Sequence, residues 1–328
     1  MSKNILISGA LGFIGSYSID KFHSKGWKID AVDNKCSNAI NKVPEGVVFH
    51  ECSISDFNYT KHGPYDIILH LASPVGPAGV LKWAGKMGHQ IIDDVQWGIN
   101  AALYHNAHLI FYSTSEIYGY RDSISELSEN DDKVLSGKYT VRNEYAIGKL
   151  LSEIILSNTY KQTKQDLESK TLRYSIIRPF NIAGARQQPD GGFVLPRFVK
   201  QALNNENITV FGDGSQQRAF THVEDIVDGV YKIIESEIEN EDWCVGNPLN
   251  RTSILEIAEK VIKITNSESK IEFVNPKEIY GSLYEEAYDK IPDSSKLRRL
   301  TGWYPKWSID EIIRDVVEYW RDKNDKNN

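Results

Sequence analysis

Two residues of the sequence, Tyr145 and Lys149, have the types and the spacing of an acid–base pair. Residues four apart lie on one face of a helix, so the Lys149 ammonium could lie beside the Tyr145 phenol. A nearby positive charge lowers the pKa of a phenol from its ordinary value of about 10, and the phenolate could then take a proton from a substrate hydroxyl. Tyr17, Tyr160 and Tyr319 are also followed by lysine at this spacing, so the spacing alone does not identify the pair.

The surroundings of Tyr145 in the sequence separate it from these other tyrosines. An apolar run at residues 109–112 is typical of a buried strand, and Ser113-Thr114-Ser115-Glu116 follows where that strand ends. A helical pattern from about residue 142 to 160 then carries Tyr145. Because ligands bind at the carboxyl ends of parallel strands, we expect Thr114 to hydrogen-bond the same substrate oxygen as Tyr145. The alternative is a surface helix pair and an ordinary strand-end threonine.

Three glycines spaced three apart, Gly9, Gly12 and Gly15, lie between a short apolar run and a helical pattern. A strand, a tight turn and a helix in this order can lay a dinucleotide pyrophosphate on the helix N-terminus. The first glycine permits the turn, the second lets the backbone approach the phosphates, and the third lets helix and strand pack closely. Glycines also occur in ordinary turns, so the prediction of a dinucleotide site depends on the strand and the helix around them.

Asp33 and Asn34 follow the second predicted strand, at residues 27–32. A carboxylate at this position suits the two ribose hydroxyls of NAD and repels the 2′-phosphate of NADP. The two residues therefore favour NAD as the cofactor. The alternative for Asp33 is a solvated turn residue.

Apolar segments separated by helix-length segments indicate the fold class. We expect strands at residues 5–8, 27–32, 47–49, 66–72, 109–112 and 172–177, and a long helical segment at residues 82–106. Strands joined by helical crossovers form a parallel sheet that is covered on both faces. The sequence thus predicts an α/β protein with a Rossmann-type doubly wound parallel sheet in residues 1–178. A smaller C-terminal α/β domain in residues 179–328 would bind the substrate, and segments of the two could interleave.

The composition excludes several classes of partner. The chain has 328 residues, 41% of them hydrophobic, and a net charge of −7, which argues against nucleic-acid and anionic-membrane partners. No apolar run approaches the roughly 18 residues of a membrane span. Cys36, Cys52 and Cys244 are widely spaced, which indicates reduced thiols in a cytoplasmic enzyme. His105 and His108 lack a suitably placed third ligand, so we expect no metal site.

These motifs together resemble the extended short-chain dehydrogenase/reductase superfamily, in its nucleotide-sugar epimerase/dehydratase branch. The glycine turn matches that of the family, and Thr114, Tyr145 and Lys149 match its catalytic triad. The resemblance extends over nearly the whole chain. Further matching segments are residues 113–119, 178–181, 193–198, 211–220, 290–293 and 300–305.

The resemblance implies NAD as the cofactor, a nucleotide-diphosphate sugar as the substrate, and a homodimer. NAD would contact Gly9, Gly12, Phe13, Ile14, Gly15, Asp33, Asn34, Ser53, Ile54, Leu71, Ala72, Tyr145 and Lys149. The substrate would contact Ser115, Asn181, Val194, Arg197, Phe211, Arg218 and Lys290. Asn181 and Arg218 would hold the diphosphate. The dimer would form through helices near residues 88–106 and 142–160, where Leu150, Leu151, Ile154 and Ile155 are compatible with this contact and equally with packing on the sheet.

The resemblance also implies that the sugar is oxidised at C4 to a 4-keto intermediate, as hydride passes to NAD. The family then diverges to inversion at C4, dehydration, or loss of a C6 carboxylate. Dehydratases carry aspartate where Ser115 lies, whereas Thr114-Ser115-Glu116 and Arg142 match nucleotide-sugar glucuronate decarboxylases. Glu116 would be an acid–base group near C5 or a structural carboxylate. We therefore expect decarboxylation or C4 epimerisation.

The sequence departs from the decarboxylase pattern at three places. Lys290 replaces an arginine, and a compact ammonium cannot offer a bidentate fork to a carboxylate. Ser53 replaces an adenine-contacting aspartate, and residues 73–88 are atypical. Two further hypotheses stay open, a C4 dehydrogenase that releases the 4-keto sugar and a non-catalytic NAD-binding scaffold.

Overall fold

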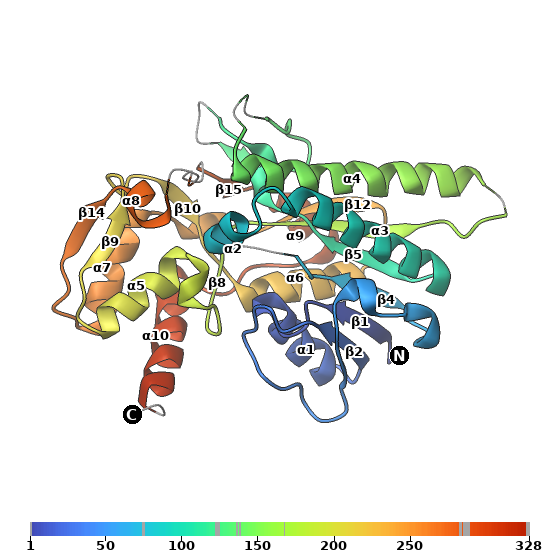
Figure 1. Ribbon diagram of the computed structural model, residues 1–328, viewed down its shortest axis with the longest axis horizontal. Coiled ribbons are helices and arrows are strands. Elements are labelled where there is room, and N and C mark those ends of the chain that lie inside the picture. The colour runs from blue at the N-terminus through green and yellow to red at the C-terminus, as the bar shows by residue number, and fades with distance from the viewer. Residues whose placement is uncertain are drawn as a thin grey trace.

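A parallel sheet of seven strands forms the centre of the protein (Figure 1). The structure is a computed structural model, and it describes residues 2–73, 76–121, 125–135, 137, 139–166, 168–281, 284 and 289–325. In spatial order the strands are β12 (Glu241–Val245), β7 (Arg173–Pro179), β5 (His108–Tyr112), β4 (Ile67–His70), β1 (Asn4–Ser8), β2 (Lys28–Asp33) and β3 (Val48–Glu51). The strand order reverses between β1 and β4, which is where doubly wound sheets bind ligands. The predicted fold class is confirmed.

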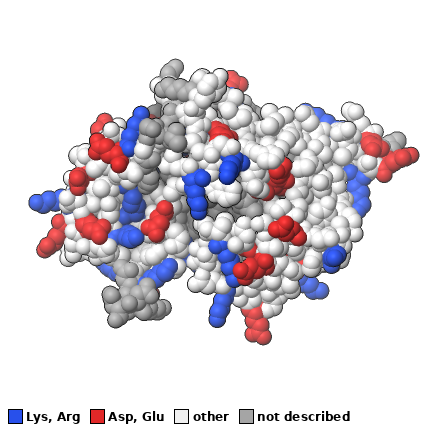
Figure 2. Space-filling view, in the orientation of Figure 1, with Lys and Arg blue, Asp and Glu red and all other residues white. Residues whose placement is uncertain are grey.

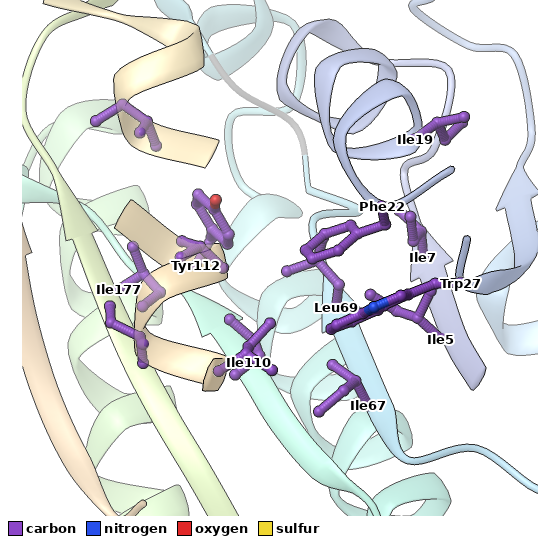
Figure 3. Packing of buried hydrophobic residues seen from close by; sticks show 14 of the residues in the cluster. Ile5, Ile7, Ile19, Phe22, Trp27, Ile67, Leu69, Ile110, Tyr112 and Ile177 are labelled. Carbon is purple, nitrogen blue, oxygen red and sulfur yellow. The ribbon is translucent and has the colours of Figure 1, made fainter. Parts of the chain in front are cut away.

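Helices cover both faces of this sheet, because its strands are apolar on both sides. One face is covered by α1 (Phe13–Ser24), α6 (Val223–Glu235) and α9 (Ser295–Thr301), and the other by α3 (Met87–His105) and α4 (Val141–Gln165). Figure 1 shows α3 and α4 together on one side, with α1 and α6 opposite. In Figure 3, Phe22 of α1 and Trp27 lie against Leu69 of β4, and their rings stack at 4.7 Å.

A second hydrophobic core lies in the C-terminal half of the chain, at the left of Figure 1. It is built from α5 (Val194–Leu203), α7 (Ile254–Thr265) and α10 (Ile309–Asp325), with the paired strands β9 (Ile208–Phe211) and β14 (Ile271–Val274). This core matches the predicted smaller α/β unit. No helix in the described part of the chain is long and apolar enough to cross a membrane.

Short strand pairs complete the fold, and of these β6–β15 connects the two halves of the chain. The pairs are β6 (Glu126–Leu127) with β15 (Ile291–Pro292), β8 (Ile182–Ala183) with β11 (Thr221–His222), and β10 (Gln217–Ala219) with β13 (Arg251–Ser253). The remaining helices are α2 (Gly76–Lys82) and α8 (Pro276–Tyr280). Because β6 precedes α4 and β15 follows the second core, the β6–β15 pair brings residues near Lys290 towards the sheet.

The structure differs from the sequence prediction in two elements. The helical segment expected from residue 82 begins later, as α3 at Met87. A separate helix, α2, ends at Lys82, and residues 83–86 lie between the two helices, where Gly85 has a φ of +80°. The chain also returns to the first sheet after residue 178, because β12 pairs with β7. Segments from both sides of residue 178 therefore interleave, and the boundary near this residue stays a prediction. Residues 74 and 75 of the atypical segment lie outside the described residues.

Candidate active site

The glycine turn follows β1 and contains three close backbone approaches. Gly9 has a φ of +66°, and a Cβ atom there would lie 2.8 Å from the Ala72 nitrogen. A Cβ atom at Gly15 would lie 2.2 Å from the Gly9 oxygen, which also accepts a hydrogen bond from the Gly12 nitrogen at 3.2 Å. A side chain at Gly9 or Gly15 would therefore force the turn apart.

The N-terminus of α1 is open to a ligand. Phe13 and Ile14 begin the helix, no side chain caps it, and its first turn holds no acidic residue. Leu71 and Ala72 are held beside the turn because their N–H groups donate to Ser8 Oγ at 3.2 and 3.3 Å. Free helix N–H groups together with the helix dipole favour an anion. The residues that form this turn therefore fit a dinucleotide pyrophosphate.

Asp33 ends β2 and is buried against the glycine turn. Its carboxylate accepts hydrogen bonds from the Leu11 nitrogen at 3.0 Å and from the Lys35 nitrogen at 2.7 Å. Burial raises the pKa of Asp33, and the two backbone hydrogen bonds oppose that rise. The alternative of a solvated turn residue is wrong, because Asp33 is buried and its carboxylate accepts a hydrogen bond from the turn. Each carboxylate oxygen keeps a second lone pair that a ribose hydroxyl could use.

Asn34 and Ser53 lie side by side, although they come from different segments. Asn34 Nδ2 donates a hydrogen bond to Ser53 Oγ at 3.3 Å. Ile54 follows and is buried. The structure thus brings these predicted cofactor residues together next to Asp33.

Thr114 and Tyr145 meet at the carboxyl end of β5. Thr114 caps a short 3-10 helix, Ser115–Tyr118, by accepting a hydrogen bond from the Glu116 nitrogen at 3.2 Å. Its hydroxyl also hydrogen-bonds the phenol of Tyr145, which lies near the start of α4. Burial raises the pKa of Tyr145, Thr114 lowers it and Glu116 raises it. In the protein itself burial outweighs the Thr114 hydrogen bond, and the lowering expected for this phenol would also need the positive charge of an oxidised nicotinamide.

Lys149 lies one helical turn after Tyr145 and is buried. Its Nζ atom donates a hydrogen bond to the Tyr112 oxygen of β5 at 2.8 Å. Burial lowers the pKa of Lys149 to about 8, while Asp94 and Glu153 act in the opposite direction. The phenol and the ammonium are thus both positioned at the end of β5.

Glu116 is held between two cations that come from distant segments. Its Oε1 atom lies 2.5 Å from Lys290 Nζ, and its Oε2 atom accepts a hydrogen bond from Arg142 Nη1 at 2.7 Å. Burial would raise the pKa of Glu116, but Lys290 and Arg142 hold it well below its ordinary range. Burial lowers the pKa of Lys290 to about 8, and Glu116 opposes this shift. Glu116 is therefore an anion across neutral pH, and Lys290 is the titratable member of the cluster. Ser115, its neighbour in the chain, is buried.

Arg218 and Lys290 are brought together by an isolated parallel β-bridge. Arg218 Nη1 lies 3.3 Å from Asp289 Oδ1, and its positive charge contributes to lowering the pKa of Lys290. Asn181 follows β7 with a φ of +37°, and its buried Nδ2 atom has no hydrogen-bond partner within the described residues. A phosphate oxygen would satisfy that donor. These groups fit the predicted diphosphate contacts.

The guanidinium of Arg197 packs over the ring of Phe211, which is buried in the second domain. The Arg197 guanidinium lies 4.1 Å from the centre of the Phe211 ring, and Nη1 donates a hydrogen bond to Thr209 Oγ1 at 2.5 Å. Tyr284 meets Phe211 edge-on at 5.8 Å. Val194 begins α5, one turn before Arg197. A guanidinium and an aromatic ring are groups on which a planar nucleobase can stack.

The atypical segment at residues 73–88 joins both halves of the chain. A Cβ atom at Gly76 would lie 2.7 Å from the Phe193 ring. The Glu144 carboxylate accepts hydrogen bonds from the Gly85 nitrogen at 2.7 Å and from the Gly88 nitrogen at 3.1 Å. Figure 2 shows lysine and arginine side chains over α2, near the middle of this face. Through Gly85 and Gly88 the segment contacts Glu144, the residue that directly precedes Tyr145.

Sequence reasoning did not identify a metal-ligand cluster, did not place Asp289 or Tyr284 at the site, and named Arg142 only as a match to the decarboxylase pattern, without its contact to Glu116. Asp30, His50 and His62 bring their possible ligand atoms within 4.8 Å of one another, on β2, β3 and the loop beyond. Asp30 also accepts a hydrogen bond from Tyr65, and His62 stacks on Phe57. The residues added to the site are Arg142, Asp289 and Tyr284. Of these, Arg142 carried a signal, because it lies three residues before Tyr145 and hence on the same helical side.

The chain is similar to known proteins over nearly its whole length. Residues 5–246 match the family described as "NAD dependent epimerase/dehydratase family". The UDP-N-acetyl-alpha-D-glucosaminuronate decarboxylase of Bacillus cytotoxicus is 30% identical, over 98% of this chain and 99% of that protein. UDP-glucuronic acid decarboxylase 1 of Danio rerio is 30% identical, over 97% of this chain and 72% of that protein.

Solved structures share the fold over the whole chain. The UDP-glucose 4-epimerase of Thermotoga maritima has a TM-score of 0.85 at 24% identity, covering 98% of this chain and 99% of that one. A UDP-glucuronic acid 4-epimerase from Bacillus cereus, solved with UDP-glucuronic acid and NAD, has a TM-score of 0.81 at 24% identity and the same coverage.

Proposed function

Because the chain belongs to the NAD-dependent epimerase/dehydratase family, we propose that it decarboxylates a nucleotide-activated hexuronate through a 4-keto intermediate. The observation that carries this choice is the position of Glu116 between Lys290 and Arg142, next to Thr114 in the chain. The named decarboxylases among the relatives support the same reaction class.

NAD is the cofactor, and when bound it takes a hydride from C4 of the sugar and later returns one. The glycine turn and the N-terminus of α1 would hold its pyrophosphate, and Asp33 the adenosine ribose. Lys149 would hold the nicotinamide ribose and supply positive charge near the phenol.

Tyr145 accepts the C4 hydroxyl proton in the first step. Thr114 donates a hydrogen bond to the same region and stabilises the phenolate. Positive charge from oxidised NAD, held through Lys149, would counteract the rise in the Tyr145 pKa that burial causes. The sugar then carries a C4 ketone, so its C6 carboxylate belongs to a β-keto acid.

Loss of carbon dioxide follows from that arrangement. The C5–C6 bond breaks, carbon dioxide leaves, and its electron pair becomes a C4–C5 enolate. A proton must then reach C5. Glu116 is ionised and cannot donate one, whereas Lys290, whose pKa burial lowers to about 8, can. We therefore assign Glu116 to the positioning of two cations and Lys290 to proton donation, which replaces the predicted acid–base role of Glu116.

C4 epimerisation is the second candidate. Lys290 favours it, because a single ammonium binds a carboxylate less specifically than the arginine fork of the decarboxylase pattern. Dehydration is disfavoured because Ser115 has no carboxyl proton to give a departing hydroxyl.

We also infer a homodimer in a reducing compartment, the cytoplasm. Ile147, Leu151 and Ile154 are large apolar residues exposed along α4, at the spacing of one helical face. Within α4, Leu150 and Ile155 instead pack against cores of the subunit. All three cysteines are free thiols.

The test of the proposed function uses the NAD-loaded protein and a panel of nucleotide sugars. UDP-glucuronic acid and UDP-N-acetylglucosaminuronic acid should raise absorbance near 340 nm, and NMR should identify a decarboxylated product. Tyr145→Phe should reduce that rate by about 10² or more, since a general base is removed. A product that keeps C6 and is inverted at C4 would establish the second candidate instead.

A further inference from the structure

The helices α3 and α4 touch at the level where Lys149 leaves α4. A Cβ atom at Gly148 would lie 3.3 Å from Ile91 Cδ1 and 3.4 Å from Gly88 Cα. Gly148 directly precedes Lys149, so this contact fixes the distance between the two helices beside the ammonium. Any Cβ atom here would press on Ile91 and Gly88, so the glycine favours this close approach.

Asp94 lies on this same face of α3. It follows Ile91 by three residues and precedes Gly98 by four, and this spacing places the three residues along one side of a helix. A Cβ atom at Gly98 would lie 4.0 Å from His70 Cγ of β4. Asp94 therefore lies between the α4 contact and the β4 contact and is buried there.

Lys149 follows Gly148 on α4, and its ammonium reaches the end of β5. Lys149 Nζ lies 4.8 Å from the centre of the Phe111 ring and donates a hydrogen bond to the Tyr112 oxygen. Burial and the positive charge of Lys149 lower the pKa of His70 to about 3, so His70 is neutral. The charged groups that face Lys149 are therefore Asp94 from α3 and Glu153 from α4.

Glu153 is already paired with another cation. Its two oxygens accept hydrogen bonds from Arg178 at 3.0 and 2.7 Å. Asp94 accepts its hydrogen bond from an uncharged group, the Gln90 amide, at 2.7 Å. Asp94 is therefore the carboxylate whose charge is left for Lys149.

We propose that Asp94 is a positioning residue for catalysis, the counter-charge that keeps Lys149 an ammonium inside the α3–α4 contact. This proposal rests on the role of Lys149 in the proposed function. Gln90 orients the Asp94 carboxylate, and Asp94 in turn sets the pH range over which Lys149 carries its charge. Asp94 touches neither the substrate nor the reacting atoms.

The pH dependence follows from two groups, Lys149 and Asp94. Lys149 loses its proton near pH 8, and Asp94 raises that pKa against burial. Burial raises the pKa of Asp94 itself to about 6, so Asp94 is an anion above that value. Without the carboxylate, Lys149 would become neutral at lower pH, and the alkaline loss of activity would begin earlier.

The test measures the protonation of Lys149 directly, without any substrate. In protein labelled with ¹³C-lysine, the Lys149 Cε resonance is assigned by its loss in Lys149→Met, and its titration is followed from pH 6 to 10. Asp94→Asn should lower the midpoint by about one pH unit or more, the usual effect of removing an adjacent opposite charge. Asp94→Glu should restore it, and Asp93→Asn, at an exposed neighbour on the same helix, should leave it unchanged.

Two results would overturn the proposal. One is a midpoint that Asp94→Asn leaves in place, and the other is an equal shift in Asp94→Glu, which would assign the effect to shape. The alkaline limb of NAD reduction by UDP-glucuronic acid should move with the NMR midpoint. If the wild-type protein fails to reduce NAD with this probe, the proposed function fails for that sugar, while the titration still tests Asp94.

Discussion

Lys290 Nζ lies 2.5 Å from Glu116 Oε1, and this contact joins the end of β5 to the C-terminal half of the chain. Arg142 of α4 takes the other oxygen. One carboxylate thus holds two cations at the place where the sugar must lie if Thr114 and Tyr145 act on C4. Glu116 and Lys290 come from different halves of the chain, so both halves contribute to the candidate active site.

Removal of the Lys290 charge should abolish product formation. Lys290→Met should lower the rate at which the decarboxylated product forms by about 10² or more, because the donor that protonates C5 after carbon dioxide has left is lost. Lys290→Arg introduces the arginine of the decarboxylase pattern, so it should bind UDP-glucuronic acid at least as well, but it raises the pKa of the donor and should protonate C5 more slowly than the wild type. Single-turnover assays with both variants check this order. Equal rates for Lys290→Met and the wild type would remove Lys290 from the chemistry.

The stability of the fold should depend on pH through Glu116. Its folded-state pKa is depressed below the ordinary value of 4.5, so its contribution is present above pH 4.5 and is lost as the pH falls. Glu116→Gln should cost about 3 kcal/mol at pH 7, because two cations lose their shared partner. Urea unfolding at pH 7, 5 and 3.5 measures the difference from the wild type. A difference that stays constant down to pH 3.5 would show that folding does not lower the pKa of Glu116.

Much of this site could be predicted from local patterns, because its parts lie where strands end. The glycine turn, Asp33 and the set of Thr114, Tyr145 and Lys149 each follow a recognisable strand or lie in a long helix. The structure brings each of them to the predicted edge. In these cases the position of a residue at the end of a strand or along one helix is enough to place it in space.

The remaining features depend on contacts between distant segments. The strand β12 was missed because it lies within the C-terminal half, and only its pairing with β7 shows that it belongs to the first sheet. The upward pKa shift of Tyr145 and the ionised state of Glu116 follow from burial and from Lys290, which no local pattern reveals. Asp94 gave no signal in the sequence, because its partner is on another helix.

The glycine turn allows a matched comparison of two glycines. Gly15→Ala should abolish NAD binding and destabilise the protein, since its Cβ atom would lie 2.2 Å from the Gly9 oxygen. Gly79→Ala in α2 meets no atom within 4 Å and should be neutral or stabilising by up to about 1 kcal/mol. Isothermal titration with NAD and thermal unfolding measure both effects. Normal NAD affinity in folded Gly15→Ala would contradict the assignment of the turn.

The account rests on the fate of the C6 carboxylate, which one labelled substrate reports. The NAD-loaded protein is incubated with UDP-glucuronic acid and UDP-N-acetylglucosaminuronic acid that carry ¹³C at C6, and the label is followed by NMR. The account predicts that, with at least one of them, the label appears as carbon dioxide and bicarbonate while a UDP-pentose or its N-acetylamino counterpart accumulates. It also predicts that Tyr145→Phe forms neither. Retention of the label in a C4-inverted or 4-keto uronate, with no carbon dioxide from either sugar, would contradict it.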